Sequence, residues 1–249
     1  MKIGALQTAY LPWLGFFDQI ARCDLFVIFD DLQYTKKDWR NRNKIKTPSG
    51  PMWLTVPIAS SGAINKRICQ VQISYQEEWQ SRHWRALKFN YSRAPHFNQY
   101  SDFFRRLYQT KEKHLATLNR RIIDYCIDRL GITTEILYSA DSQIEEDYRK
   151  SCQGLMDPNL RIVHLCERFG ADRFLEGSSG KAYIDLELLR DAGVILEFHD
   201  YDHPKYRQQF GEFIPYLSIV DLLFNEGENS LSILTNQPSS RNLRSAYQG

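Results

Sequence analysis

Residues 34–46 contain six basic residues with two aromatic residues among them, shortly after two aspartates. An arginine fork matches phosphate oxygens in pairs, and an aromatic ring can stack on a sugar or a base. A solvated, charged loop is the plain alternative interpretation of the same pattern. We predict that this stretch binds an anionic ligand. Its predicted ligand-binding residues are Tyr34, Lys37, Trp39, Arg40, Asn41 and Arg42.

Acid–base chemistry could come from His83 and from the two aspartates. Asp30 and Asp31 end the apolar run "LFVIF". His83 falls on the helical face of Trp79 and Leu87, and a histidine has the near-neutral pKa that suits a general base. A half-buried packing histidine is the alternative. We take His83 as the best candidate base and place Asp30 and Asp31 in the wall of the site.

Two loops complete the predicted site. Gln7 and Tyr10 lie in a strand-to-helix loop, where they could orient a polar ligand or merely hold the loop. The second loop, in "FLEGSSGKAY", could offer backbone N–H groups to an anion, although a plain turn explains it equally well. It is not a Walker A loop, because only two residues separate its glycines. Its predicted binding residues are Gly177, Ser178, Ser179, Gly180 and Tyr183.

The elements that must position these residues follow from hydrophobic patterning. "KIGALQ", "LGFFDQIARC" and "DLFVIFDD" form strand, helix and strand, the size of a βαβ unit. A second such unit runs from Asp172 to Tyr201. Parallel strands place their sites at their carboxyl ends, so Gln7 and Asp30–Asp31 should share one edge. We predict an α/β fold with a Rossmann-like, mainly parallel sheet and a helical middle segment.

The rest of the chain shows no convincing domain boundary. We predict one domain over residues 1–249, with a loose polar tail at 235–249. "MWLTVPI" and "ICQVQIS" are predicted strands, and Ser74 with Glu77 forms a capping box that should start a helix. Helices are predicted to end at Gly131, Gly170 and Gly227.

Composition limits the function. The chain has 249 residues, of which 43% are hydrophobic and 13% aromatic, with a net charge of +2. This near balance argues against a long basic groove for nucleic acid. The five cysteines are scattered and form no CxxC pair, so we predict no metal site and a reducing, cytoplasmic location. No apolar run reaches the length of a membrane span.

Four segments together resemble the WbqC-like family of bacteria. They are "LQTAYLPWLGFFDQIARCDLFVIFDDLQYTKKDWRNRNKI", "WLTVPI", "FLEGSSGKAYID" and "YRQQFGEFIPYLSIVDLLFNEG", in family order over most of the chain. One departure stands out. The family usually has Gln-Pro at the start, where this chain has Gln7-Thr8.

The resemblance implies a role in bacterial surface-polysaccharide biosynthesis, such as that of O-antigen, or in a related pathway. The implied reaction is acyl or aminoacyl transfer to an amino sugar, in particular a nucleotide-linked one, from an acyl-carrier or aminoacyl-carrier protein. His83 or Asp31 would then deprotonate the sugar amine, which makes both the predicted catalytic residues. Alternatives are a nucleotidyltransferase-like enzyme and a non-catalytic sugar-nucleotide-binding or scaffold protein. The cofactor stays unknown.

Overall fold

The computed structural model describes residues 1–59, 62–152 and 156–236, which divide into two compact units. The first unit comprises Met1–Thr8, Asp18–Leu32 and Thr133–Asp202, and the second Ala9–Phe17, Gln33–Ile132 and His203–Gly249. Helix α1 (Leu14–Ala21) contributes residues to both units. The predicted helical middle falls in the second unit, together with Ala9–Phe17 and the segment that begins at His203. From residue 237 on, the predicted loose tail lies outside the described residues.

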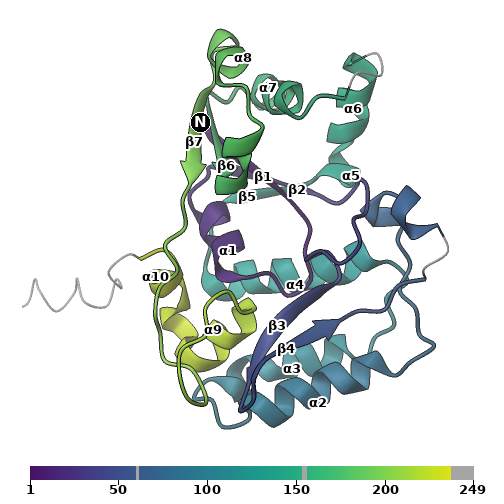
Figure 1. Cartoon of the computed structure of the whole chain (residues 1–249), viewed down its shortest axis with the longest axis vertical. Coiled ribbons are helices and arrows are strands. Elements are labelled where there is room, and N and C mark those ends of the chain that lie inside the picture. The colour runs from purple at the N-terminus through teal and green to yellow at the C-terminus, as the bar shows by residue number, and fades with distance from the viewer. Residues whose placement is uncertain (60–61, 153–155, 237–249) are drawn as a thin grey trace, which may run out of the picture. The chain divides into compact units, whose positions relative to one another are not determined.

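A five-stranded parallel sheet forms the centre of the first unit, in the order β5-β2-β1-β6-β7 (Figure 1). Its strands are β1 (Lys2–Gln7), β2 (Leu25–Phe29), β5 (Glu135–Tyr138), β6 (Arg173–Gly177) and β7 (Ile195–His199). In a doubly wound sheet the strand order reverses beside the first strand, as it does here. The predicted Rossmann-like α/β fold is confirmed.

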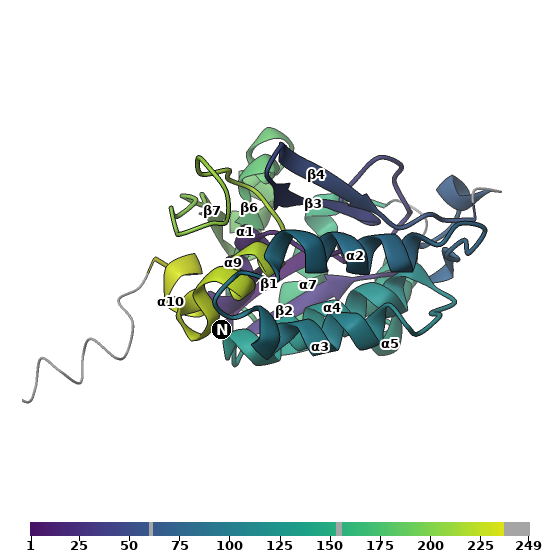
Figure 2. The same ribbon diagram turned by 90° about the horizontal axis from the view of Figure 1, so that it is seen from below.

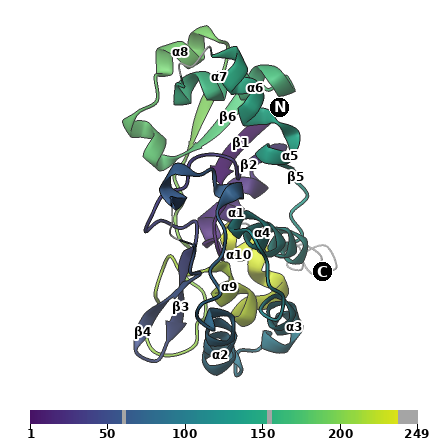
Figure 3. The same cartoon turned by 90° about the vertical axis from the view of Figure 1, so that its right-hand side faces the viewer.

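One face of this sheet carries the core of the first unit. Every residue of β2 is buried, as expected for an uninterrupted apolar strand of a parallel sheet. Ile3, Val27 and Phe174 pack in one cluster with residues of the helices grouped beside the sheet in Figure 3. These helices are α6 (Ile144–Ser151), α7 (Pro158–Phe169) and α8 (Leu186–Asp191).

The sheet opens between β1 and β6 at the carboxyl ends of the strands. The β1–β6 pairing stops at Gly4↔Leu175, whereas β1–β2 continues to Gln7↔Phe29 and β6–β7 to Gly177↔His199. Beyond that point the Gln19 side chain donates to the Leu175 carbonyl at 2.9 Å and replaces a ladder hydrogen bond. β1 and β6 are the strands between which the order reverses, and ligands of open α/β sheets bind at that switch point.

The second unit combines a hairpin with packed helices (Figure 2). The hairpin strands β3 (Arg42–Thr47) and β4 (Gly50–Thr55) pair antiparallel. The helices are α2 (Trp79–Tyr91), α3 (Phe97–Leu107), α4 (Leu115–Leu130), α9 (Ile219–Glu226) and α10 (Ser230–Leu234). Helix α2 contacts β3 and α3, and α9 contacts α3 and β3, so the apolar faces of these helices are covered within the unit.

Two local predictions in this unit need correction. "ICQVQIS" is not a strand: Ile68–Gln70 is a 3₁₀ turn packed on α4, and the pairing of this segment with other described residues is limited to isolated bridges such as Ile58↔Ile73. The capping box is wrong as well, because α2 begins at Trp79 after Glu78 and has no side-chain cap. The basic stretch includes a strand, β3. Gly131 and Gly170 end α4 and α7 in the left-handed conformation, as predicted.

Candidate functional site at the carboxyl edge of the sheet

The predicted site residues of the first unit lie at one edge of the sheet. Gln7 ends β1, Asp30 and Asp31 follow β2, and Gly177 ends β6. In a parallel sheet these are all carboxyl ends of strands. Asp31 and Ser178 therefore lie at the same edge of the sheet, with β1 between their strands. Ser179, Gly180 and Tyr183 follow in the same loop.

Thr8, which stands where the family usually has proline, is fully buried at this edge. Its backbone N–H donates to the Phe29 carbonyl at 2.9 Å, a bond that a proline could not make. The departure from Gln-Pro therefore ties the start of the loop to β2. Its hydroxyl oxygen is buried without a hydrogen-bond partner among the described residues.

Asp30 holds a neighbouring helix turn in place. Its Oδ1 accepts the Ala140 N–H at 3.0 Å at the start of α5 (Ser139–Ser142), and its side chain is buried. A carboxylate in this position satisfies a backbone donor that the helix leaves unpaired. Asp30 therefore has a structural partner, in addition to its predicted role in ligand binding.

Asp31 differs sharply from its neighbour. Its side chain is only 3% exposed, and Oδ1 has no hydrogen-bond partner among the described residues. Burial raises the pKa of Asp31 to about 6, helped by the negative charges of Asp30 and Glu145 and opposed by the Ser139 hydroxyl. A buried carboxylate with a raised pKa beside a sheet crevice is the typical environment of a general base.

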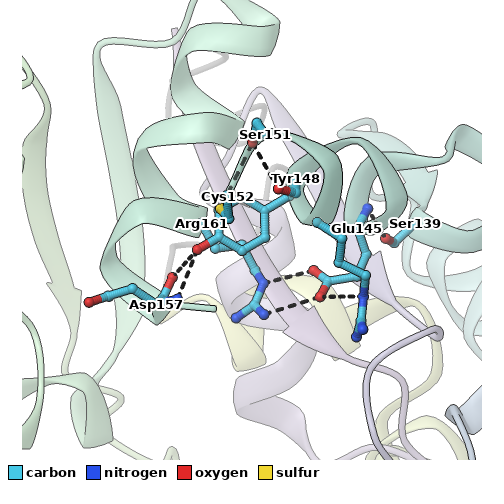
Figure 4. A network of polar contacts seen from close by, with 8 residues as sticks. Ser139, Glu145, Tyr148, Ser151, Cys152, Asp157 and Arg161 are labelled. Carbon is cyan, nitrogen blue, oxygen red and sulfur yellow. Dashed lines mark hydrogen bonds and ion pairs between the residues drawn. The ribbon is translucent and has the colours of Figure 1, made fainter. Parts of the chain in front are cut away.

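Glu145 forms a buried ion-pair network (Figure 4). Its charge also acts on Asp31. The guanidinium of Arg161 donates to both of its carboxylate oxygens, at 2.8 and 3.1 Å, and Arg149 lies 3.3 Å away. The Glu145 N–H donates to the Ser139 hydroxyl at 3.3 Å. No sequence signal identified this network, because Arg161 is sixteen positions from Glu145 on another helix.

The Gly-Ser loop uses one of its N–H groups internally. Residues Ser178–Ala182 form a 3₁₀ turn, and the Gly177 N–H donates to Oε1 of Glu176 at 3.1 Å. The Tyr183 hydroxyl donates to the same oxygen at 3.4 Å. Burial raises the pKa of Glu176, although these two donors oppose the shift. A carboxylate of the chain itself thus occupies the start of the predicted anion nest.

Gly180 must be a glycine for this loop to close. A Cβ there would collide with Cγ of Glu176 and lie 3.0 Å from Cδ1 of Ile184. We expect Gly180→Ala to lower the free energy of unfolding by about 1–3 kcal/mol, the usual cost of overpacking. Gly177→Ala is the matched control: its Cβ would meet only the Ser179 hydroxyl, at 3.9 Å, and the change should stay within about 0.5 kcal/mol. Urea denaturation of both variants measures the difference, and equal losses would contradict it.

Carboxylates dominate this edge of the sheet. Besides Asp30, Asp31 and Glu176, Asp18 is fully buried, and its Oδ2 lies 2.6 Å from both Nε of Arg22 and Nε2 of His199 at the end of β7. Its Oδ1 has no hydrogen-bond partner among the described residues. Such an edge favours a ligand with an amine over one with a phosphate, since an opposite charge stabilises each carboxylate.

The predicted basic stretch lies in the second unit and is partly neutralised there. Arg40 pairs with Asp38 at 3.4 Å, and Asp38 also accepts from the Thr35 hydroxyl and the Trp39 N–H. Burial alone would raise the pKa of Asp38, but Arg40 and these donors lower it. Tyr34 is almost fully buried, and its N–H donates to the Lys66 carbonyl.

Trp39 and Lys37 are the solvent-facing members of that stretch. Trp39 is 40% exposed, with its ring centroid 5.5 Å from that of Trp53. Arg42 lies over the Trp53 ring at 4.4 Å and donates to the Lys37 carbonyl at 2.5 Å. The buried Asn41 side chain donates to the Val56 carbonyl, so it ties two segments of backbone together.

His83 and Tyr10 belong to a buried network of the second unit. The Tyr10 hydroxyl lies 2.8 Å from Nδ1 of His83 and 2.5 Å from the Tyr108 hydroxyl. Burial lowers the pKa of His83 to about 3, the charge of Arg82 lowers it further, and a backbone hydrogen bond at Thr55 opposes the shift. His83 was predicted to be a base because histidine ordinarily has a near-neutral pKa, and its pKa of about 3 departs from that value.

We expect the His83 imidazole to stay neutral from pH 5 to pH 8. Its folded-state pKa of about 3 lies below the ordinary value of 6.5, so the native state does not take up the proton in this range. Two-dimensional NMR of the imidazole ¹⁵N nuclei measures this, with free histidine as the reference. A chemical-shift titration of His83 near pH 6.5 would contradict the buried environment.

The described residues contain neither a metal-binding cluster nor a membrane-spanning helix. Within residues 1–59, 62–152 and 156–236, no group of three or more His, Cys, Asp or Glu side chains is placed to hold a metal ion. Over the same ranges, no helix has both the length and the apolar character needed to cross a membrane.

Comparisons with known proteins identify the family of this chain. The profile of the WbqC-like protein family matches residues 7–233. The uncharacterized protein Rv1507c of Mycobacterium tuberculosis is 38% identical over 228 residues, which cover 91% of this chain and 94% of that protein. No solved structure matches the chain. The chain therefore belongs to the WbqC-like protein family.

Proposed function

We propose that the protein transfers an acyl or aminoacyl group to the amine of a sugar, with Asp31 as the general base. The observation that carries this proposal is the buried Asp31 carboxylate, with a pKa of about 6 and a free oxygen at the edge of the sheet. A base with a pKa near the working pH combines a large ionised fraction with useful proton affinity.

The proposed step has a simple proton and electron balance. The carboxylate of Asp31 removes a proton from the sugar ammonium, which frees the nitrogen lone pair. The nitrogen attacks the carbonyl carbon of a carrier thioester, and the C–N bond forms. The C–S bond then breaks and the thiolate leaves with the electron pair. The nitrogen gives up its second proton to the thiolate, and the products are an amide and a thiol. We assign the proton transfer to Asp31 alone, because a pKa of about 3 makes the buried His83 imidazole too weak a base to take a proton from an ammonium.

The acidic edge supports an amine as the acceptor. Asp31 and Asp18 each keep a carboxylate oxygen without a partner among the described residues, and an unpaired buried acceptor is costly. A bound ammonium supplies N–H donors to such an oxygen. The opening between β1 and β6 is the place where α/β sheets bind their ligands.

The proposed biological setting rests on the resemblance to the family. We place the reaction in the biosynthesis of a bacterial surface polysaccharide, with a nucleotide-linked amino sugar as acceptor and an acyl-carrier or aminoacyl-carrier protein as donor. The five cysteines are free thiols, which supports a reducing cytoplasmic compartment.

The test is a product assay with the purified protein. A panel of nucleotide-linked sugars, each as the free amine and as the matching hydroxyl, is incubated with acyl and aminoacyl thioesters. Mass spectrometry should find an amide with the amine only, together with one equivalent of thiol. Release of pyrophosphate from a nucleoside triphosphate with magnesium would instead favour a nucleotidyltransferase. Saturable sugar-nucleotide binding without product from any donor would favour a binding or scaffold protein.

A further inference from the structure

A cavity of about 620 Å³ opens on the second unit, and none of the predicted site residues lines it. Its volume lies within the range of small-molecule sites. One wall is the exposed face of α2, and the others come from the β3–β4 turn and the 209–210 segment. The lining residues are Pro48, Arg85, Lys88, Phe89, Asn90, Ser92, Arg93, Gln209 and Phe210.

The charge of this cavity is entirely positive. Arg85, Lys88 and Arg93 line it, no acidic residue does, and no ion pair joins the three to a carboxylate of the described residues. Arg85, Lys88, Phe89 and Ser92 follow the spacing i, i+3, i+4, i+7, so they lie on one helical face. Basic side chains near the C-terminal end of a helix are also stabilised by the helix dipole. The dipole does not explain why a cavity lies between them.

Two aromatic rings and one buried amide complete the lining. Phe89 is 80% exposed and Phe210 37% exposed, an unfavourable state for large apolar side chains unless a partner covers them. The Asn90 side chain is 5% exposed, and its NH₂ donates to the Ala86 carbonyl at 2.8 Å. Its Oδ1 has no donor within the described part of the chain. The cavity thus offers cations and ring faces to a ligand.

We propose that this cavity binds a nucleoside diphosphate. The phosphates would pair with Arg85, Lys88 and Arg93, and the base would stack on Phe89 and Phe210. Inorganic phosphate has no ring to stack on Phe89 and Phe210, which is why a nucleotide fits better. The inference does not depend on the proposed acyl transfer, since it concerns only this cavity.

The experiment is calorimetric titration of the full chain with ADP, GDP, UDP and CDP, and with inorganic pyrophosphate as the probe for the phosphate part alone. At least one nucleotide should bind saturably and more tightly than pyrophosphate. Affinity should fall as salt rises, because exposed cations are screened. Lys88→Ala and Arg93→Ala should each weaken nucleotide binding about tenfold, the value of one charge-assisted hydrogen bond.

Variants separate the ring contribution from charge. Phe89→Ala should weaken the nucleotide about tenfold and leave pyrophosphate unchanged. Arg82→Ala is the matched control, since Arg82 is on the same helix, pairs with Glu77 and does not line the cavity. These side chains are exposed, so the variants should fold. Equal affinity for pyrophosphate and nucleotides, no nucleotide binding, or equal losses in Arg82→Ala and Lys88→Ala would overturn the proposal. Acyl transfer can fail in its own assay without affecting this result.

Discussion

Replacing Asp31 by asparagine is expected to lower the rate of amide formation about 10²–10⁴-fold, the usual contribution of a general base. Asparagine keeps the size of the side chain but cannot take a proton. The wild-type rate should rise with pH as Asp31 ionises near its pKa of about 6, and this limb should vanish in Asp31→Asn. Pre-steady-state measurements of amide formation across pH 5–8 test both expectations.

Asp30→Asn is the matched control for this prediction. Asp30 is the neighbouring acid, but its Oδ1 accepts the Ala140 N–H, and an asparagine carbonyl can accept the same bond. Its rate should therefore stay within a fewfold of the wild-type value. If Asp31→Asn retains full activity, or if both variants lose activity equally, Asp31 is not the base.

The raised pKa of Asp31 also has a stability signature. The folded-state pKa of about 6 lies above the ordinary value of 3.8, so protonated Asp31 favours the native state. Its contribution is complete below about pH 4 and is lost as pH rises through about 6. At pH 7 Asp31→Asn should be more stable than the wild type by about 2–3 kcal/mol, and at pH 4 the two should be nearly equal. Urea denaturation at both pH values tests this without any substrate.

Replacing Arg161 by alanine is expected to cost about 3–5 kcal/mol of unfolding free energy, because it leaves the fully buried Glu145 carboxylate without its bidentate partner. Arg149 stays 3.3 Å away and compensates in part, which favours the lower end of that range. Arg161→Lys should recover only part of the loss, since lysine lacks the planar fork. Denaturant unfolding of the purified variants is the measurement.

Arg168→Ala provides the control on the same helix. Arg168 also bridges α7 to an acid of α6, Asp147, but that carboxylate is 39% exposed. An ion pair open to solvent is worth about 0–1 kcal/mol. A loss in Arg168→Ala as large as that in Arg161→Ala would show that burial of Glu145 does not set the cost.

The strands and helix ends of this protein were predictable because their causes are local. The apolar run of β2 and the glycines after α4 and α7 act through neighbouring residues, so the sequence alone indicated the parallel sheet. It also indicated that Asp31 and Ser178 share the carboxyl edge, since strand direction determines that edge. The same local reasoning failed for "ICQVQIS", where packing on α4 outweighs strand propensity.

The chemical state of each side chain was decided only by tertiary structure. Asp30 and Asp31 are adjacent and identical in type, yet one caps a helix turn and the other keeps a free, buried oxygen with a raised pKa. His83 became a neutral, buried histidine, and Glu145 gained Arg161 from a distant helix. Burial and pairing depend on residues far apart in the chain, so sequence spacing indicates where a site lies, whereas the fold decides which group can move a proton.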